Sequence, residues 1–184
     1  MLEILTILGL IGLDQLTKYL TDLYLMPLGT SVPLIEGIFH FTSAHNTGAA
    51  FSILAGNRFF LLALASIAAA VMLVFLFKKR SMLHFLTRLC LALIIGGAIG
   101  NIIDRAMFGY VRDMLEFRFI NFAIFNVADC GVSIGAALLA LDILFGKGKH
   151  YFDEKPKEAA KKEDAPEKDP MGAPDQQKNA SEPS

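Results

Sequence analysis

Four long apolar stretches, separated by polar segments, occupy most of the chain. Each has about the 20 residues that an α-helix needs to cross a hydrocarbon core of ~30 Å. Strands with open edges cannot replace them, because unpaired backbone groups are too costly in lipid. The pattern predicts an all-α integral membrane protein whose transmembrane domain covers residues 1–148. The four transmembrane helices are expected at about residues 2–25, 59–77, 83–105 and 122–145.

The polar segment Met26–Arg58, between the first two stretches, alternates apolar and polar residues in places, and Pro33 and Gly37 interrupt it. This pattern is typical of short strands. We therefore expect a small β-type segment on the membrane surface. Residues 149–184 are rich in Lys, Glu, Ala and Pro and are too polar to bury a core, which predicts a disordered, charged tail.

The basic residues of the loops predict how the helices are oriented. They cluster after the second stretch, at Lys78, Lys79 and Arg80, and again after the fourth. Because cytoplasmic loops carry an excess of Lys and Arg, both termini and the tail are expected in the cytoplasm and the β-type segment on the extracytoplasmic side. Three arginines between the third and fourth stretches oppose this bias. The first stretch lacks the basic start and cleavage site of a secretory signal, so we expect it to be retained.

Composition excludes several classes of function. The hydrophobic fraction of 54% and the mean hydropathy of +0.48 agree with a membrane protein, and the net charge of −1 argues against a nucleic-acid partner. The two cysteines form neither a disulfide framework nor a metal motif. The sequence has no HExxH motif of zinc peptidases, and we expect no metal site.

Ionisable residues inside the apolar stretches are the main candidates for chemistry, since a central Asp or Lys costs about 2.5–3.5 kcal/mol to insert. Asp14 and Lys18 are four residues apart, so they share one helix face and can pair. Further acids and amides fall toward the outer ends of the last two helices and the loop between them. They are Asn101, Asp104, Asp113, Asn126 and Asp129. The sequence therefore predicts a cluster of carboxylates and amides at the extracytoplasmic face.

Two carboxylates within hydrogen-bond reach of each other share one proton. The ionised member can accept a proton from water, and the protonated member can polarise a carbonyl and protonate the leaving amine, which together hydrolyse a peptide. Physical reasoning alone does not decide whether Asp104 or Asp113 is the partner of Asp129. Asp104, next to Arg105, is more typical of a structural ion pair.

Two other classes of function remain open from the residues alone. A small proton-coupled transporter or channel component also keeps acids and lysines in its helices, but there they line a path across the membrane. A membrane assembly factor would use the same acids only to hold helices together. The clustering of the acids at one face favours hydrolysis.

Five motifs occur in order along residues 1–146: DQLTK, NTGAAFS, GGAIGNIIDR, VRDML and FNVAD. Together they resemble the prolipoprotein signal peptidases, also called signal peptidase II. The resemblance implies an aspartic endopeptidase of the bacterial cytoplasmic membrane that uses no cofactor. Such an enzyme removes the signal peptide of a prolipoprotein on the N-terminal side of a cysteine that carries diacylglyceryl. The expected partners are therefore prolipoproteins and membrane lipid, and we expect a monomer.

The resemblance also assigns residues. It places the catalytic pair at Asp113 and Asp129. Positions that support the site or bind substrate are Asp14, Lys18, Asn46, Gly48, Asn101, Asp104, Arg105 and Asn126. Arg112 stands where an apolar residue is common in the family, and we expect it either to lower the pKa of Asp113 or to face solvent.

Overall fold

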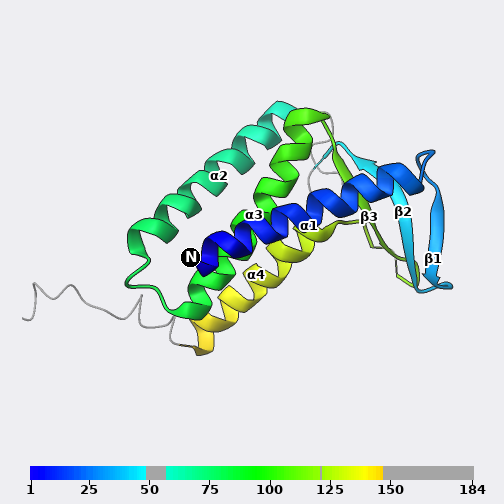
Figure 1. The fold of residues 1–184 in the computed structure, drawn as a ribbon. Coiled ribbons are helices and arrows are strands. Elements are labelled where there is room, and N and C mark those ends of the chain that lie inside the picture. Colours follow the sequence, from blue (N-terminus) through cyan, green and yellow to red (C-terminus); the bar gives the residue numbers. More distant parts are fainter. Residues whose placement is uncertain (49–56, 121, 147–184) are drawn as a thin grey trace, which may run out of the picture. The chain divides into compact units, whose positions relative to one another are not determined.

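The computed structural model describes residues 1–48, 57–120 and 122–146, so the predicted tail at 149–184 lies outside the described residues. Helices and a three-stranded antiparallel sheet make up the described part (Figure 1). In chain order, the elements are α1 (Leu2–Tyr24), β1 (Ser31–Ile35), β2 (Phe39–Asn46), α2 (Arg58–Lys79), α3 (Phe85–Met107), β3 (Val111–Phe117) and α4 (Val127–Phe145).

Three of these helices, α2, α3 and α4, are long and apolar enough to cross a membrane. They confirm the prediction of membrane helices in the second, third and fourth apolar stretches. The remaining helix, α1, is equally long at 23 residues. It differs in carrying four charged residues, Glu3, Asp14, Lys18 and Asp22.

The helix α3 lies at the centre of the bundle and contacts α1, α2 and α4 (Figure 1). Its buried face, which includes Leu91, Ala92 and Ile95, packs against Ile7 of α1 and Leu76 of α2. Apolar burial does not drive helices together in lipid, so close van der Waals contact between helices matters more than in water.

Glycines allow α4 to approach α3 at such short range. A Cβ atom added at Gly135 would lie 2.8 Å from the backbone oxygen of Cys90 and 2.9 Å from Cγ1 of Ile94. At Gly97, an added Cβ would collide with the backbone oxygen of Ala128. The two helices therefore touch backbone to backbone, which places the first turn of α4 beside the last turns of α3.

The sheet has the order β1-β2-β3 and lies at the end of the bundle where α1 and α3 finish (Figure 1). The strands β1 and β2 confirm the β-type segment predicted within Met26–Arg58. The third strand, β3, was expected to be a loop. It forms because β2 pairs along its length, with Asn46 opposite Val111 and Phe41 opposite Leu115. Asp113 is therefore held on a strand.

The start of α4 was also predicted wrongly, at residue 122 instead of Val127. Asn126 caps the helix: its Oδ1 accepts the backbone N–H of Asp129 at 2.9 Å, and Asp129 Oδ2 accepts that of Asn126 at 3.2 Å. This capping box satisfies N–H groups that the first turn would leave unpaired. Just before it, Phe125 bridges Leu115 of β3. The apolar segment before the cap thus contacts the sheet and is not part of the helix. Hydropathy alone cannot distinguish an apolar segment beside a strand from the first turn of a helix.

The glycine contacts predict different effects for one substitution at two helical sites. Gly135→Ala should lower the free energy of unfolding by about 1–3 kcal/mol, because the new methyl group meets backbone that cannot move aside. Gly12→Ala, on α1, meets nothing within 4 Å and should stabilise the protein by up to about 1 kcal/mol. Thermal unfolding of both variants in the same detergent measures the difference; equal shifts would contradict the close packing of α3 and α4.

Candidate active site

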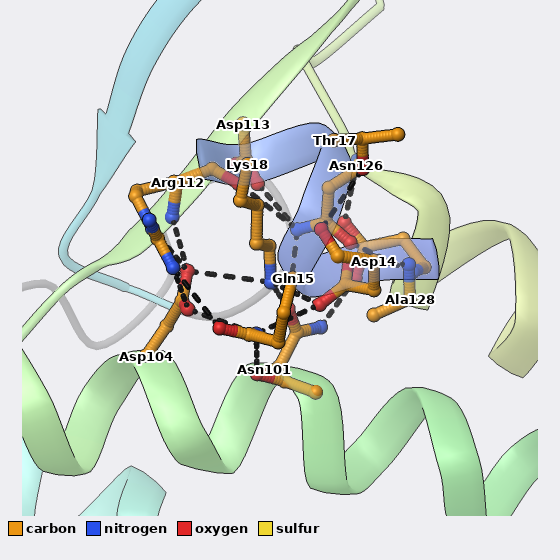
Figure 2. Close-up of polar contacts among 12 residues, drawn as sticks. Asp14, Gln15, Thr17, Lys18, Asn101, Asp104, Arg112, Asp113, Asn126 and Ala128 are labelled. Atoms are coloured by element: carbon orange, nitrogen blue, oxygen red, sulfur yellow. Dashed lines mark hydrogen bonds and ion pairs between the residues drawn. The ribbon is translucent and has the colours of Figure 1, made fainter. Parts of the chain in front are cut away.

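Two asparagine side chains connect Asp113 on β3 with Asp129 in the first turn of α4. Asn126 is fully buried and donates from Nδ2 to Asp113 Oδ1 at 2.6 Å and to Asn101 Oδ1 at 3.1 Å. Asn101, on α3, in turn donates to Asp129 Oδ1 at 2.8 Å. Figure 2 shows Asn126 beside Asp113 within this set of contacts. Each carboxylate is thus oriented by an amide donor.

Asp113 is 2% exposed, and the charge of Asp129 acts on its carboxyl group. Burial raises the pKa of Asp113 to about 7, and the negative charge of Asp129 adds to the rise. Hydrogen bonds from Asn126 and Asn46 and the positive charge of Lys18 act in the opposite direction. Two such coupled carboxyl groups can hold one proton between them near neutral pH.

A buried ion-pair network lies next to these residues and includes Asp14, Lys18 and Asp104 (Figure 2). Lys18 has a side chain that is 0% exposed, and its Nζ lies 2.8 Å from Asp14 Oδ2 and 3.3 Å from Asp104 Oδ2. The same Nζ donates to Asn101 Oδ1 at 3.0 Å. The second oxygen of Asp14 accepts the backbone N–H of Ala128 at 2.9 Å. The network therefore links α1, α3 and the first turn of α4.

Arg112 completes this network from β3. Its guanidinium nitrogens lie 2.9 Å from Asp104 Oδ1 and 2.9 Å from Asp22 Oδ2, and Nη2 donates to Gln15 Oε1 at 3.1 Å. Asp104 is thus ion-paired to both Lys18 and Arg112. In the buried centre, the negative charges of Asp14 and Asp104 are matched by the positive charges of Lys18 and Arg112.

Both expectations for Arg112 were wrong. The residue is only 7% exposed, so it does not face solvent. The pKa of Asp113 is raised and not lowered, because burial and Asp129 outweigh the positive charges nearby. The reason is the alternation of side chains along a strand, which turns Arg112 and Asp113 to opposite faces of β3.

The remaining predicted residues lie where β2 ends. Arg105 on α3 donates from Nη2 to the backbone oxygen of Gly48 at 2.8 Å. Asn46 Oδ1 accepts the backbone N–H of Gly48 at 3.0 Å and closes a turn there. The rest of the NTGAAFS motif, residues 49–52, lies outside the described residues.

A cavity of about 500 Å³ opens beside these groups. Its polar lining includes Asn46, Asn101, Arg105 and Asp129, and its apolar lining includes Phe125 and Ile134. The volume lies in the usual range for sites that bind small molecules or peptide segments. A cavity lined by both polar and apolar side chains fits a ligand that has both polar and apolar parts.

Two other chemistries find little support in the structure. The sequence GVSIG at Gly131–Gly135 matches the GxSxG pattern of serine hydrolases, but it lies inside α4. That pattern needs a sharp turn between a strand and a helix to expose its serine. In the part of the chain that the structure describes, no group of three or more His, Cys, Asp or Glu residues is placed to hold a metal ion.

Comparison with known proteins identifies the family. The family model described as "Signal peptidase (SPase) II" matches residues 6–145. The chain belongs to the signal peptidase II family. Consistent with this, the lipoprotein signal peptidase of Brevibacillus brevis is 45% identical over 144 residues, which cover 77% of this chain and 93% of the relative. That of Clostridioides difficile is 40% identical over 149 residues, 81% of this chain and 99% of the relative.

Solved structures agree with this assignment. One described as a bacterial membrane enzyme, obtained by the in meso method at 2.3 Å resolution, matches with a TM-score of 0.73 and 31% identity. The match covers 83% of this chain and 91% of that one. This signal peptidase II family member is therefore an aspartic-type membrane peptidase, which removes signal peptides from prolipoproteins. The predicted family and enzyme class are confirmed.

Sequence reasoning missed two members of the network in this signal peptidase II family member, Gln15 and Asp22. Gln15 Nε2 donates to Asp14 Oδ2 at 3.1 Å and to Asp104 Oδ1 at 3.2 Å. A signal was present, because Gln15, Lys18 and Asp22 follow one another at helical spacing and share a face of α1. Their partner Arg112 lies 90 residues from Asp22, which no local pattern reveals.

Removing the central cation tests the network. Lys18→Met should lower the free energy of unfolding by about 3 kcal/mol or more, because Asp14 and Asp104 would keep buried charges with fewer partners. Lys79→Met, at an exposed position on α2, is the matched control and should leave stability unchanged. Chemical or thermal unfolding of the two purified variants provides the comparison. A stable, fully folded Lys18→Met protein would show that the buried charges do not depend on this lysine.

Proposed function

We propose that this signal peptidase II family member cleaves prolipoproteins directly before a diacylglyceryl-modified cysteine, with Asp113 and Asp129 as the catalytic pair. The observation that supports this pair most is the run of hydrogen bonds that joins the two acids through Asn126 and Asn101. Burial and the charge of Asp129 also raise the pKa of Asp113 to about 7. Asp129 lines the cavity. Asn126, which caps the helix that carries Asp129, donates from Nδ2 to Asp113 Oδ1 at 2.6 Å. The pair therefore combines one shared proton with access to a substrate.

In the proposed reaction, the two carboxyl groups hold a water molecule between them. The ionised carboxylate accepts a proton from the water as the water attacks the carbonyl carbon before the modified cysteine. The protonated carboxyl group polarises that carbonyl and then donates its proton to the leaving amine. The Arg105 side chain and the asparagine amides at the cavity stabilise the developing oxyanion.

The other predicted residues have supporting roles in this proposal. Asp14, Lys18 and Asp104 hold α1, α3, α4 and β3 in place through buried ion pairs and hydrogen bonds. Asn101 and Asn126 orient the two carboxylates. At the cavity, Arg105 and Asn46 meet the substrate, and Gly48 joins them through its backbone.

The lipid part of the substrate explains the cavity in this proposal. Its hydrocarbon chains stay in the bilayer beside the helices, and its signal segment enters between them with the scissile bond against the polar lining. Only an extended, membrane-held peptide reaches the two acids in this arrangement, which restricts cleavage to lipid-modified precursors.

We further propose that α1 is a fourth membrane span. Its two central charged residues, Asp14 and Lys18, are 0% exposed and paired inside the bundle. Its outward-facing residues are apolar, among them Leu8, Leu13 and Leu16. Charged side chains in membrane helices generally face the bundle interior and pair in this way. At 1.5 Å per residue, its 23 residues extend about 35 Å, enough to cross the hydrocarbon core.

The orientation follows from charge. The basic residues Lys78 and Lys79 lie in the last turn of α2, and Arg80 follows them before α3 begins at Phe85. Asn101 and Asp104 lie toward the other end of α3. Basic loops remain in the cytoplasm. We therefore place both termini in the cytoplasm and the active site at the extracytoplasmic face of the bacterial inner membrane. A monomer, with residues 1–148 as its membrane domain and 149–184 as a cytoplasmic tail, is sufficient for this function.

Isosteric replacement of either acid tests the catalytic pair. Asp113→Asn and Asp129→Asn should each reduce kcat on a lipid-modified precursor peptide by about 100-fold to 10,000-fold, because the amide neither accepts nor donates the required proton. Both proteins should remain folded. Glu36→Gln, which changes an exposed acid in the turn after β1, is the control and should cleave normally. Wild-type turnover by either Asn variant would rule out the assignment.

The pH dependence of kcat/KM tests the shared proton. The profile should be bell-shaped and should fall on its basic side near pH 7, since the pair loses its proton as pH rises through the raised pKa of Asp113. Asn46→Ala removes a hydrogen bond that lowers this pKa, so its basic limb should move to higher pH. A basic limb that keeps its position in Asn46→Ala would contradict the assignment of this limb to Asp113.

A further inference from the structure

The guanidinium group of Arg112 joins β3 to two helices at once. Its Nη1 lies 2.9 Å from Asp22 Oδ2 at the outer end of α1, and Nη2 lies 2.9 Å from Asp104 Oδ1 on α3. Nη2 also donates to Gln15 Oε1 at 3.1 Å. The planar fork of an arginine can satisfy several acceptors in fixed directions, so these contacts determine where the side chain lies.

The backbone of the same residue is held by the same acid. The N–H of Arg112 donates to Asp104 Oδ2 at 2.9 Å, and Nε donates to that oxygen at 3.3 Å. The guanidinium carbon also lies 4.6 Å from the centre of the Phe108 ring, just after the end of α3. The backbone and the side chain of Arg112 are therefore both bonded to α3. These contacts determine the position of β3 relative to α3.

Asp113 is the next residue on the same strand. Successive residues of a strand are about 3.3 Å apart and point to opposite faces. Contacts that hold Arg112 on one face therefore direct the carboxyl group of Asp113 on the other, toward Asn126 at 2.6 Å. A shift of β3 along or away from α3 would move Asp113 relative to Asp129, which lies on a different element, in the first turn of α4.

We propose that Arg112 is a positioning residue for catalysis: by joining β3 to Asp104 and Asp22, it holds Asp113 at the distance and angle that the reaction with Asp129 requires. This inference rests on the proposed function, in which Asp113 is catalytic. The Arg112 side chain makes its contacts with Asp104, Asp22 and Gln15, on the face of β3 opposite to Asp113, so we assign it no contact with the substrate or the reacting atoms.

Kinetics of three variants of the full chain test the proposal. Arg112→Met should lower kcat about 10-fold to 100-fold, because displacements near 1 Å at a reacting group have effects of this size. KM should change less than about two-fold, because the guanidinium group of Arg112 is occupied by Asp104, Asp22 and Gln15. Arg112→Lys keeps the charge without the fork and should be intermediate, and Asp22→Asn should cause a smaller loss of kcat. Arg118→Met, which removes an exposed arginine just after β3, is the control.

The pH profile separates positioning from loss of folded protein. Unfolding scales the profile equally at every pH, whereas displacement of Asp113 changes its surroundings. The charged groups that face Asp113 are Asp129 on α4, Lys18 on α1 and Arg105 on α3, and β2 contributes the neutral Asn46. A displaced Asp113 would be better solvated and farther from Asp129, so the basic limb of Arg112→Met should move to lower pH.

The outcomes for this inference and for the proposed function are distinct. Normal cleavage by Asp113→Asn would refute the catalytic pair itself. An inactive Asp113→Asn together with wild-type kcat and an unshifted basic limb in Arg112→Met would refute the positioning role alone, as would a uniformly scaled profile. If Arg112→Met fails to fold, Arg112→Lys and Asp22→Asn take its place as the test. A wild-type kcat and an unshifted basic limb in both variants overturn the proposal. A reduced kcat together with a shifted basic limb supports it.

Discussion

A lysine buried in an apolar helix bundle must be neutralised, and the way Lys18 is neutralised organises the rest of this molecule. Its ammonium group lies between Asp14 and Asp104, with its side chain 0% exposed. Each acid then uses its remaining hydrogen-bonding capacity on a backbone N–H. Asp14 accepts from Ala128 at the start of α4, and Asp104 accepts from Arg112 on β3. One cation on α1 thus positions the two elements that carry Asp113 and Asp129.

The low polarity that makes these ion pairs necessary also creates the chemistry of the site. Burial disfavours the charged form of a carboxyl group, and a second carboxylate nearby adds to the effect. Asp113, with its pKa raised to about 7, experiences both influences. The neutral amides of Asn126 and Asn101 stand beside the acids and orient them without adding charge. The site is therefore held in place before substrate arrives, which is the usual basis of electrostatic catalysis.

The small sheet supplies the strand β3, which carries Asp113 and which a helix bundle alone would lack. It brings β3, and with it Asp113, to the C-terminal ends of α1 and α3. The lining of the cavity beside it includes the polar Asp129 and Arg105 and the apolar Phe125 and Ile134. Membership of the signal peptidase II family implies prolipoprotein substrates. The mixed polar and apolar lining of the cavity supports the proposed lipid-attached peptide.

The sequence by itself determined the membrane helices, the strands within Met26–Arg58 and the family, because hydropathy and short motifs are local properties of the chain. Physical reasoning from the residues did not decide between Asp104 and Asp113 as the partner of Asp129, which only the family resemblance assigned. The sequence also did not show that β3 is a strand or that α4 begins at Val127. Those features depend on which residues meet across the fold, such as Arg112 with Asp22, 90 positions apart. Hydropathy reports the solvent around a residue, whereas only the tertiary structure decides its partner.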